Sequence, residues 1–416
     1  MNILKKMWNG FTTGRVGQTM LAPIGWFWGS TSASGEIVND QTLLRLSTAW
    51  RCISLIAGTI SSLPLTLYKE DKNGVPVAYK EHPLFNILKA DPNYEQTNVD
   101  FWHFLSCSLE MRGNAYARID RNDRGNIVSL IPINPALMNV SRDSDNLLKY
   151  SWSENGRIYE GTNKDIFHIR GFGGDPLGGL SPLVYGCNVF GMALAADKTA
   201  SEMFKNGLRP SGVLTFSTFL TDEQRDIAND KLSAKIGADN SGKPLVLEGG
   251  SKWEQITLSP EAAQMLQSRA FSVEEICRIF GVPPHMVGHT EKTTSWGSGL
   301  EQQNLSFLQY TLRERLKRIE QAINKQLLTP AERTSGVHVS FNLESLLRAD
   351  SQGRANFYQT MTLIGAMTIN EVRRLEHLPP VDGGDEPRIQ MQNVPLIDAD
   401  VAAIGKSFNE IRKENA

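Results

Sequence analysis

Apolar residues recur every three or four positions over long stretches of this chain, which is the spacing of amphipathic helices. The first stretch predicts a helix over residues 42–62 that ends before Pro64. Its apolar positions are Leu43, Leu46, Trp50, Ile53 and Ile56. The same spacing predicts helices at about 98–112, 182–207, 222–236, 260–280, 301–328, 349–363 and 369–378. The longest apolar seam lies in the 301–328 helix and runs through Leu305, Leu308, Leu312, Leu316, Ile319, Ile323 and Leu327.

Short strands separated by turn residues fill the regions between the first three of these helices. Asn73-Gly74 predicts a hairpin between strands at 65–69 and 75–79, since both residue types tolerate positive φ. Residues 115–169 form further strands, broken at 123–125 and at Asn155-Gly156. Later strands are predicted at 212–216, 245–247, 253–258 and 337–341. The fold class is therefore α+β, and 416 residues are enough for two or three domains.

The charge balance argues against tight nucleic-acid binding. The chain carries 43 Lys and Arg against 45 Asp and Glu, a net charge of −2. A protein that neutralises many phosphates needs a basic surplus. The largest basic cluster comprises Arg313, Arg315, Lys317 and Arg318. The apolar seam of its helix predicts that these charges lie on the outer face, toward solvent or a neighbouring subunit.

Cysteine spacing and hydropathy restrict further which kind of protein this chain can be. The four cysteines show no CxxC spacing, which favours reduced thiols in a cytosolic protein over a disulfide framework or a metal site. The basic N-terminal segment has an apolar patch at 20–28, but Pro23 and Gly25 interrupt it. We therefore expect a flexible arm and not a signal peptide. No apolar run is long enough to span a membrane.

Candidate chemistry is sparse. The glycine-rich segment 171–182 resembles a phosphate-binding loop, but the Lys-Ser/Thr pair of a P-loop is missing, so a hinge that leads into a helix capped by Ser181 is favoured. His285 and His289 have ligand spacing without a helix or a catalytic glutamate. We predict no catalytic residues, no metal site and no cofactor. An enzyme that uses the glycine-rich loop for a phosphorylated ligand, and a helical adaptor or scaffold protein, remain as alternatives.

Several motifs, in order along the chain, resemble the portal proteins of tailed double-stranded DNA bacteriophages. The most specific are Phe280-Gly-Val-Pro-Pro-His-Met-Val-Gly288 and Leu300-Glu-Gln-Gln-Asn304, followed by Ile319-Glu-Gln-Ala-Ile-Asn-Lys-Gln-Leu-Leu328. Ser47–Ser54, His82-Pro-Leu-Phe85 and Gly179-Leu-Ser-Pro182 also match the pattern. The resemblance extends from about residue 40 to about residue 390. One departure is Glu314-Arg315, where many relatives have Pro-Trp.

The resemblance implies the portal fold: a wing, a helical stem, a small α/β clip and a helical crown, assembled as a ring. The implied parts are a flexible arm (1–40), the wing (41–181), a first stem helix (182–209), the clip (210–258), a second stem helix (259–288), a tunnel loop (289–300), the long helix with a return to the wing (301–344), the crown (345–380) and an acidic flexible tail (381–416).

The resemblance also implies the function and the partners. Such rings, typically of twelve subunits, sit at the capsid vertex of the virion, and viral double-stranded DNA is packaged and ejected through them. The implied partners are further copies of the chain, the large terminase subunit, a head-completion adaptor, and the major capsid and scaffolding proteins, with assembly in the host cytoplasm and no membrane. DNA would meet Glu291, Lys292, Thr293, Thr294, Ser295 and Trp296 of the tunnel loop. Terminase and adaptor would dock on the clip through Asp222, Glu223, Arg225, Asp226, Lys231 and Lys235.

A ring of this size is physically consistent with such a channel. Twelve helices spaced about 10 Å apart give a circumference near 120 Å and about 38 Å between opposite helix axes. Subtracting a helix diameter of about 10 Å leaves a bore of about 28 Å, which admits a DNA duplex. Each neutralised phosphate adds affinity and therefore friction, so a near-neutral chain suits a conduit.

Overall fold

A computed structural model describes residues 30–72, 74–173, 176–205, 212–215, 221–233, 252–255, 261–289, 305–343, 351–376 and 378–387. The chain divides into two compact units, residues 1–341 and 342–416, and each is described by itself. Within the described ranges, no helix combines the length and apolar character needed to cross a membrane.

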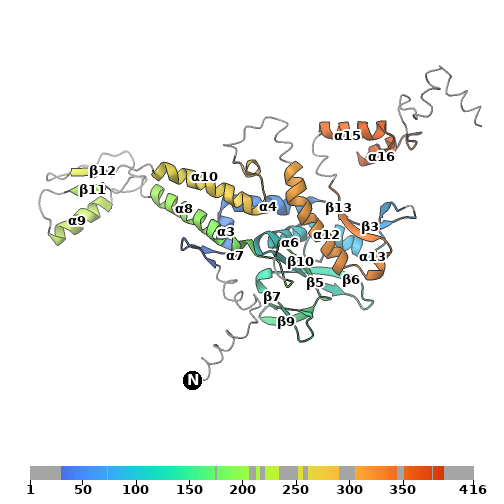
Figure 1. Ribbon diagram of the computed structural model, residues 1–416, viewed down its shortest axis with the longest axis horizontal. Helices are drawn as coiled ribbons and strands as arrows, with labels where there is room; N and C mark the ends of the chain where they lie inside the picture. The colour runs from blue at the N-terminus through green and yellow to red at the C-terminus, as the bar shows by residue number, and fades with distance from the viewer. Residues whose placement is uncertain are drawn as a thin grey trace, which may run out of the picture. The chain divides into compact units, whose positions relative to one another are not determined.

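The first unit alternates helices and short strands (Figure 1). Its elements up to residue 170 are β1 (Ser30–Thr31), β2 (Ile37–Val38), α3 (Asp40–Arg45), α4 (Ser47–Ser62), β3 (Leu65–Glu70), β4 (Pro76–Ala78), α5 (Pro83–Lys89), α6 (Asn98–Arg112), β5 (Asn114–Arg121), β6 (Ile127–Ile133), η2 (Pro135–Leu137), β7 (Met138–Arg142), β8 (Leu148–Glu154), β9 (Arg157–Thr162) and β10 (Ile166–Arg170). Then follow α7 (Pro182–Tyr185), α8 (Cys187–Lys205), β11 (Gly212–Thr215), α9 (Asp222–Ser233), β12 (Lys252–Gln255), α10 (Glu261–Phe280), η4 (Pro284–Val287), the π-helical η5 (Phe307–Leu312), α12 (Arg313–Gln326), α13 (Pro330–Thr334) and β13 (Val337–Phe341).

In the described part of this unit, three antiparallel three-stranded sheets accompany two smaller two-stranded pairs. The strand orders of the three sheets are β10-β5-β6, β7-β8-β9 and β13-β3-β4. A buried cluster joins the first two sheets, with aromatic residues Tyr116, Tyr150 and Trp152 at its centre. The predicted turns are present: Asn155 and Gly156 both have positive φ, as does Gly125. The α+β fold class expected from the sequence is confirmed.

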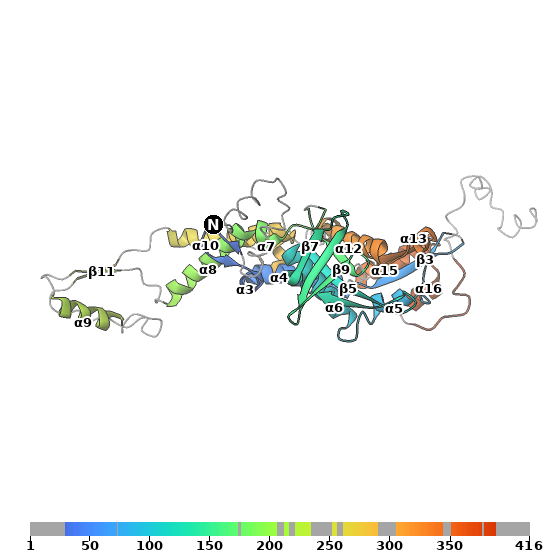
Figure 2. The same cartoon turned by 90° about the horizontal axis from the view of Figure 1, so that it is seen from below.

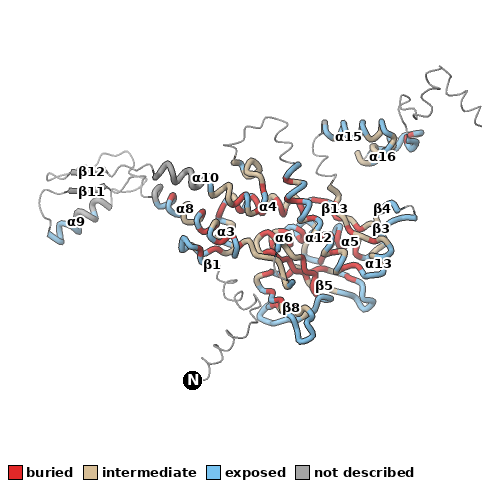
Figure 3. The backbone as a smooth tube through the Cα atoms, viewed as in Figure 1, coloured by how far each residue is buried: buried red, intermediate tan, exposed pale blue. Residues whose placement is uncertain are grey.

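Helices α6 and α12 pack on the sheets, α4 packs on α6, and the buried residues concentrate where these elements meet (Figure 3). α12 packs on β10 and β13. Its buried Glu320 accepts the backbone N–H of Phe341 at 2.9 Å, and Asn324 accepts that of Val339 at 2.8 Å. Side chains of α12 thereby satisfy the outer edge of β13, which pairs with no other described strand on that side.

Two predicted helices are each divided in two. The helix expected over 42–62 breaks at Leu46, whose backbone is extended, into α3 and α4. The helix expected from residue 182 breaks at Gly186, where a Cβ would lie 2.7 Å from the Phe190 ring. The apolar spacing was a good guide to burial at Ile53 and Ile56 but wrong at Trp50, which is 57% exposed.

α8 and α10 lie side by side and run in opposite directions (Figures 1 and 2). The chain between them forms the antiparallel pair β11–β12 and α9. Thr221 caps α9 as predicted: its hydroxyl accepts the backbone N–H of Gln224 at 3.4 Å, and its own N–H bonds the Gln224 side chain. The strand predicted at 245–247 lies outside the described residues.

The described residues begin at Ser30, before the predicted arm boundary at residue 40. β1 and β2 form a short hairpin that packs on α8. Ala33 donates its backbone N–H to Asn188 at 3.0 Å, and Lys198 pairs with Glu36 at 3.2 Å. Gly191 makes this packing possible, because a Cβ there would lie 2.1 Å from the Ser32 hydroxyl. Residues 30–38 therefore belong to the folded unit.

The second unit contains α15 (Ser351–Leu363) and α16 (Ile369–Leu375). The capping box predicted at α16 is present, with Thr368 accepting the backbone N–H of Glu371 at 3.2 Å. Asn370 is buried and ties α16 to the following loop through two hydrogen bonds with Val381.

Candidate functional site

Three glycines bring separate backbone segments into contact at the end of α6. Gly113 ends this helix in the left-handed conformation, with φ 71°. Its carbonyl accepts the backbone N–H of Gly171 at 2.7 Å, and Gly179 packs on the same carbonyl. A Cβ on Gly113 would lie 1.9 Å from the carbonyl oxygen of Leu180. The glycine-rich segment is therefore used for close backbone packing.

Asn114 locks this segment in place. Its side chain accepts the N–H of Gly179 at 2.8 Å and donates to the carbonyl of Gly179 at 3.0 Å. The side-chain oxygen of Asn114 also lies 3.0 Å from Nε2 of His168, and Nδ1 of His168 lies 3.3 Å from the Tyr150 hydroxyl. Because an amide oxygen only accepts, Nε2 of His168 carries a proton. In the neutral imidazole, which burial favours, Nδ1 accepts the hydrogen of the Tyr150 hydroxyl.

Burial, and to a lesser extent the positive charge of Arg170, lowers the pKa of His168 well below 6.5. The unfolded chain binds this proton below about pH 6.5, whereas the folded chain does not, so stability falls as the pH drops below 6.5. We expect the wild type to lose about 1.4 kcal/mol per pH unit there through this group. His168→Gln should have a lower free energy of unfolding than the wild type at pH 7.5, but this free energy should fall less between pH 7.5 and 5.5. Urea unfolding at the two pH values measures both free energies. An equal fall in the two proteins would contradict the prediction.

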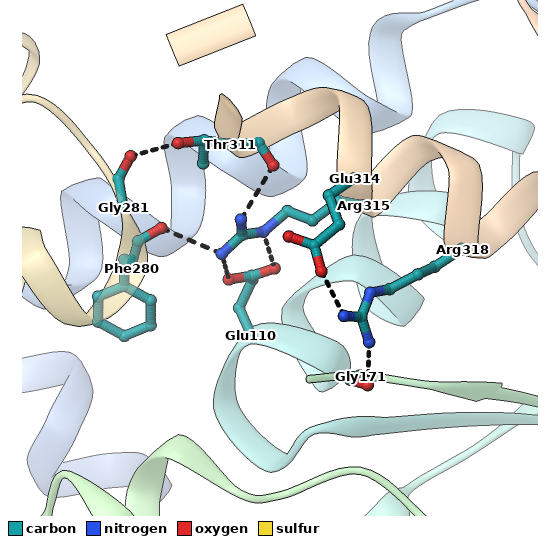
Figure 4. A network of polar contacts seen from close by, with 8 residues as sticks. All are labelled: Glu110, Gly171, Phe280, Gly281, Thr311, Glu314, Arg315 and Arg318. Atoms are coloured by element: carbon teal, nitrogen blue, oxygen red, sulfur yellow. Dashed lines mark hydrogen bonds and ion pairs between the residues drawn. The ribbon is translucent and has the colours of Figure 1, made fainter. Parts of the chain in front are cut away.

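A bidentate ion pair lies next to the glycine contact (Figure 4). Nε and Nη2 of Arg315 on α12 donate to the two carboxylate oxygens of Glu110 on α6, at 2.7 and 2.9 Å. Arg315 also donates to the carbonyl of Phe280, at the end of α10, and to that of Thr311, both at 3.0 Å. One guanidinium thereby joins α6, α10 and the helix that contains η5 and α12.

Two further contacts complete this arrangement (Figure 4). The Thr311 hydroxyl in η5 donates to the carbonyl of Gly281 at 2.6 Å. Arg318 donates to the carbonyl of Gly171 and pairs with Glu314. We call the set Glu110, Gly171, Phe280, Gly281, Thr311, Glu314, Arg315 and Arg318 the helix junction. It links the end of α10, the helix after the 290–304 segment, and the sheet-bearing part of the unit.

The helix junction corrects the prediction for the basic cluster. Arg315 and Arg318 do not lie on an outer, solvated face: both point inward and bond to backbone carbonyls of other segments. Arg313 and Lys317 are exposed, as expected. Apolar spacing missed Arg315 because a long side chain can reach across from a flanking position. The available signal was Glu110, an acid placed among the apolar residues of α6.

The π-helical turn interrupts the predicted long helix immediately before Arg315. η5 spans Phe307–Leu312 and places both Phe307 and Thr311 in buried positions. Tyr310 in the same segment is 72% exposed. π-helical turns are rare and occur often at functional sites. The seam continues as predicted from Leu312 to Leu327, whereas Leu305 at its start is half-exposed.

The structure describes only some of the site residues that the sequence predicts. Glu291, Lys292, Thr293, Thr294, Ser295 and Trp296 lie outside the described residues, as does Lys235. Asp222, Glu223, Arg225 and Asp226 are exposed on α9, where Arg225 pairs with Asp222 at 3.3 Å. Lys231 belongs to the same helix. Among the described residues, no group of three His, Cys, Asp or Glu side chains is placed to hold a metal ion.

Comparisons with known proteins agree on one family. A family model described as "Phage portal protein" matches residues 47–377. The portal protein of Enterobacteria phage HK97 is 38% identical over 89% of this chain and 88% of its own length. The probable portal protein of Streptomyces phage phiC31 is 33% identical over 86% of this chain and 79% of its own length.

Solved structures show the same fold. The neck of an empty GTA particle includes a chain with a TM-score of 0.60 and 24% identity, which covers 82% of this chain and 93% of its own length. The crystal structure of an HK97 family phage portal protein from Corynebacterium diphtheriae has a TM-score of 0.56 and 16% identity, with 76% and 99% covered.

Proposed function

Because the chain belongs to the phage portal protein family, we propose that copies of it form the ring-shaped channel at a capsid vertex through which viral double-stranded DNA is packaged and ejected. The observation that carries this proposal is the 38% identity to the HK97 portal protein over 89% of the chain. The ring has about twelve subunits, by analogy with the C12 symmetry named for a related neck structure. It assembles in the host cytoplasm and becomes part of the virion.

The proposed parts follow the fold. The sheets with α4, α5 and α6 are the wing, α8 and α10 are the stem, and β11, α9 and β12 are the clip. α15 and α16 are the crown. The order of elements supports this: α8 leads into the clip segments, and α10 runs back beside it. The alternative hypothesis, an enzyme that binds a phosphorylated ligand with the glycine-rich loop, loses its main support, because this segment packs against the backbone at Gly113.

We propose that the tunnel loop, residues 289–300, touches the DNA backbone without reading sequence. The support is its place in the family and its composition, with Lys292 and Trp296 among small polar residues. The near-neutral net charge fits a surface along which DNA slides. We also propose that the exposed charges of α9 contact the large terminase subunit and later the head-completion adaptor, and that capsid and scaffolding proteins contact the ring elsewhere.

Imaging tests the central proposal. The purified full-length chain should give rings with a central hole in negative-stain electron micrographs, because the channel exists only in the assembled form. Mass photometry should give a particle of about twelve chains. A population that remains monomeric or dimeric over the accessible concentration range would overturn the proposal.

Packaging assays test the two proposed contact regions. Arg225→Glu with Asp226→Lys should leave ring formation intact and reduce DNA packaging by tenfold or more, since reversed charges oppose docking. Lys292→Ala with Trp296→Ala should reduce packaging or retention of DNA in rings that still form. The matched control is Arg124→Glu, a charge reversal in an exposed turn of the wing. If a variant packages like this control, the region it alters is not a contact region.

A further inference from the structure

α12 presents an exposed side opposite its buried seam. Lys317, Gln321 and Lys325 lie there at intervals of four residues and are all exposed, so they share one side of the helix. Tyr310 of η5, which precedes them, is 72% exposed. We call Tyr310, Lys317, Gln321 and Lys325 the basic face. Within the described residues, Lys317 pairs with Glu320 at 2.5 Å, whereas no acidic side chain pairs with Lys325. An exposed tyrosine beside basic charges suits a protein–protein contact, in which tyrosine is enriched.

A second exposed surface, of opposite charge, lies between α5 and α6. Asp91, Tyr94 and Glu95 are all exposed, and Tyr94 has 87% of its surface accessible. We call these three residues the acidic patch. In the part of the chain that the structure describes, neither carboxylate has a basic partner, because Lys89, the nearest basic residue in the sequence, lies over the ring of Phe85 at 5.3 Å. The acidic patch therefore matches the basic face in composition: charges of one sign beside an exposed tyrosine.

The two surfaces lie at opposite edges of one sheet, β10-β5-β6. At the β10 edge, the side chain of Gln326 in α12 bonds both the backbone N–H and the carbonyl of His168, each at 2.8 Å. At the β6 edge, Leu130 donates its N–H to the carbonyl of Pro92 at 2.7 Å, and its carbonyl accepts from Asn93 at 3.0 Å. Figure 2 shows α12 along one side of these strands, and α5 with α6 along the other. The basic face and the acidic patch of one chain therefore face away from each other.

We propose that the basic face of one copy of the chain binds the acidic patch of the next copy. This inference rests on the proposed ring. A closed ring of identical subunits is built from heterologous contacts, which need two different, complementary surfaces on each subunit. Opposite charges provide that complementarity and fix the register of the contact, and the two tyrosines add apolar area. A second copy is a better occupant than DNA, because the same chain supplies the matching charges at the opposite edge of the sheet.

Charge reversal in the full-length protein tests this contact. Gln321→Glu with Lys325→Glu should raise the protein concentration at which half of the chains are in rings by about tenfold or more, because like charges then face each other. Asp91→Lys with Glu95→Lys should have the same effect. The chain with all four substitutions has opposite charges again and should form rings near the wild-type concentration. Mass photometry over a dilution series measures the fraction of chains in rings.

The matched control is Arg124→Glu with Lys164→Glu, which reverses two exposed charges in turns of the sheets. It should assemble like the wild type, because neither residue belongs to the basic face or the acidic patch.

Cross-linking identifies the contact directly. Isotope-labelled and unlabelled wild-type chains are assembled together and treated with a carbodiimide, which joins a lysine amine to a carboxylate in contact with it as an amide, with loss of water. Peptide mass spectrometry should find Lys317 or Lys325 joined to Asp91 or Glu95, with one peptide labelled and the other unlabelled. Such a mixed link forms only between two copies of the chain.

The outcomes separate this contact from the portal proposal. Wild-type rings without the mixed link, reversed variants that assemble like the control, or a four-substitution chain that does not recover assembly would overturn the contact and leave the portal proposal intact. Reversed variants that form rings but package less DNA would assign the basic face to DNA instead. A wild-type chain that stays monomeric at every concentration would overturn both.

Discussion

Gly113→Ala is expected to prevent the chain from folding into a soluble, stable protein. The new Cβ would lie 1.9 Å from the carbonyl oxygen of Leu180, and backbone atoms cannot rotate away as a side chain can. The left-handed φ of 71° adds its own penalty of about 1–2 kcal/mol for a residue with a Cβ. We expect a loss of more than about 4 kcal/mol, measured as the shift in urea midpoint or as loss of soluble protein.

Gly125→Ala is the matched control. Gly125 has a similar φ of 79°, but a Cβ there meets nothing within 4 Å. Gly125→Ala should lower the free energy of unfolding only by the conformational penalty of about 1–2 kcal/mol. The difference between the two variants isolates the contact of Gly113 with the 171–180 segment. If both variants lost the same stability, the close packing at Gly113 would have no energetic importance.

Arg315→Met is expected to have the second-largest effect. It leaves the carboxylate of Glu110 without a partner in a position where only 9% of that side chain is exposed. Breaking a buried ion pair from one side typically costs about 3–5 kcal/mol. The carbonyls of Phe280 and Thr311 also lose a donor. Urea unfolding of the purified protein measures the loss.

The double variant Glu110→Met with Arg315→Met separates the effect of the ion pair from that of the hydrogen bonds between Arg315 and the carbonyls of Phe280 and Thr311. Because apolar replacement removes both charges together, it should recover about 2 kcal/mol or more of the loss caused by Arg315→Met alone. Arg313→Ala, an exposed change two residues away, should stay within about 0.5 kcal/mol of the wild type. Additive losses in the double variant would show that Glu110 and Arg315 do not act as a pair.

The helix junction joins separate segments of the first unit through side chains of α12. Arg315 ties the end of α10 to α6, and Arg318 ties α12 to the glycine-rich segment. On the proposed function, α10 belongs to the stem and the 289–300 segment to the tunnel loop, so a force on either reaches the same residues. We expect Arg315→Met rings, where they form, to be more easily dissociated by urea than wild-type rings.

Local sequence signals were reliable within their own range. The helical spacing located α6, α10 and α16, the cap at Thr221 located the start of α9, and Asn155-Gly156 located a turn. These features depend on residues within about four positions of each other, so the sequence contains all the information that they need. The breaks at Leu46 and Gly186 were missed, since periodicity continues across a short interruption.

Partners that are distant in the chain could not be predicted in this way. Gly113 is needed because Gly171 and Gly179 fold back onto it, and Arg315 turns inward because Glu110 is buried opposite.

The sequence by itself determined the α+β class, most helix positions and, through the order of its motifs, the portal family. Only the tertiary structure decided which glycines carry backbone contacts and which arginines point inward. The physical reason is that caps and periodicity are local interactions, whereas a side chain's burial and partner depend on which distant surface packs against it.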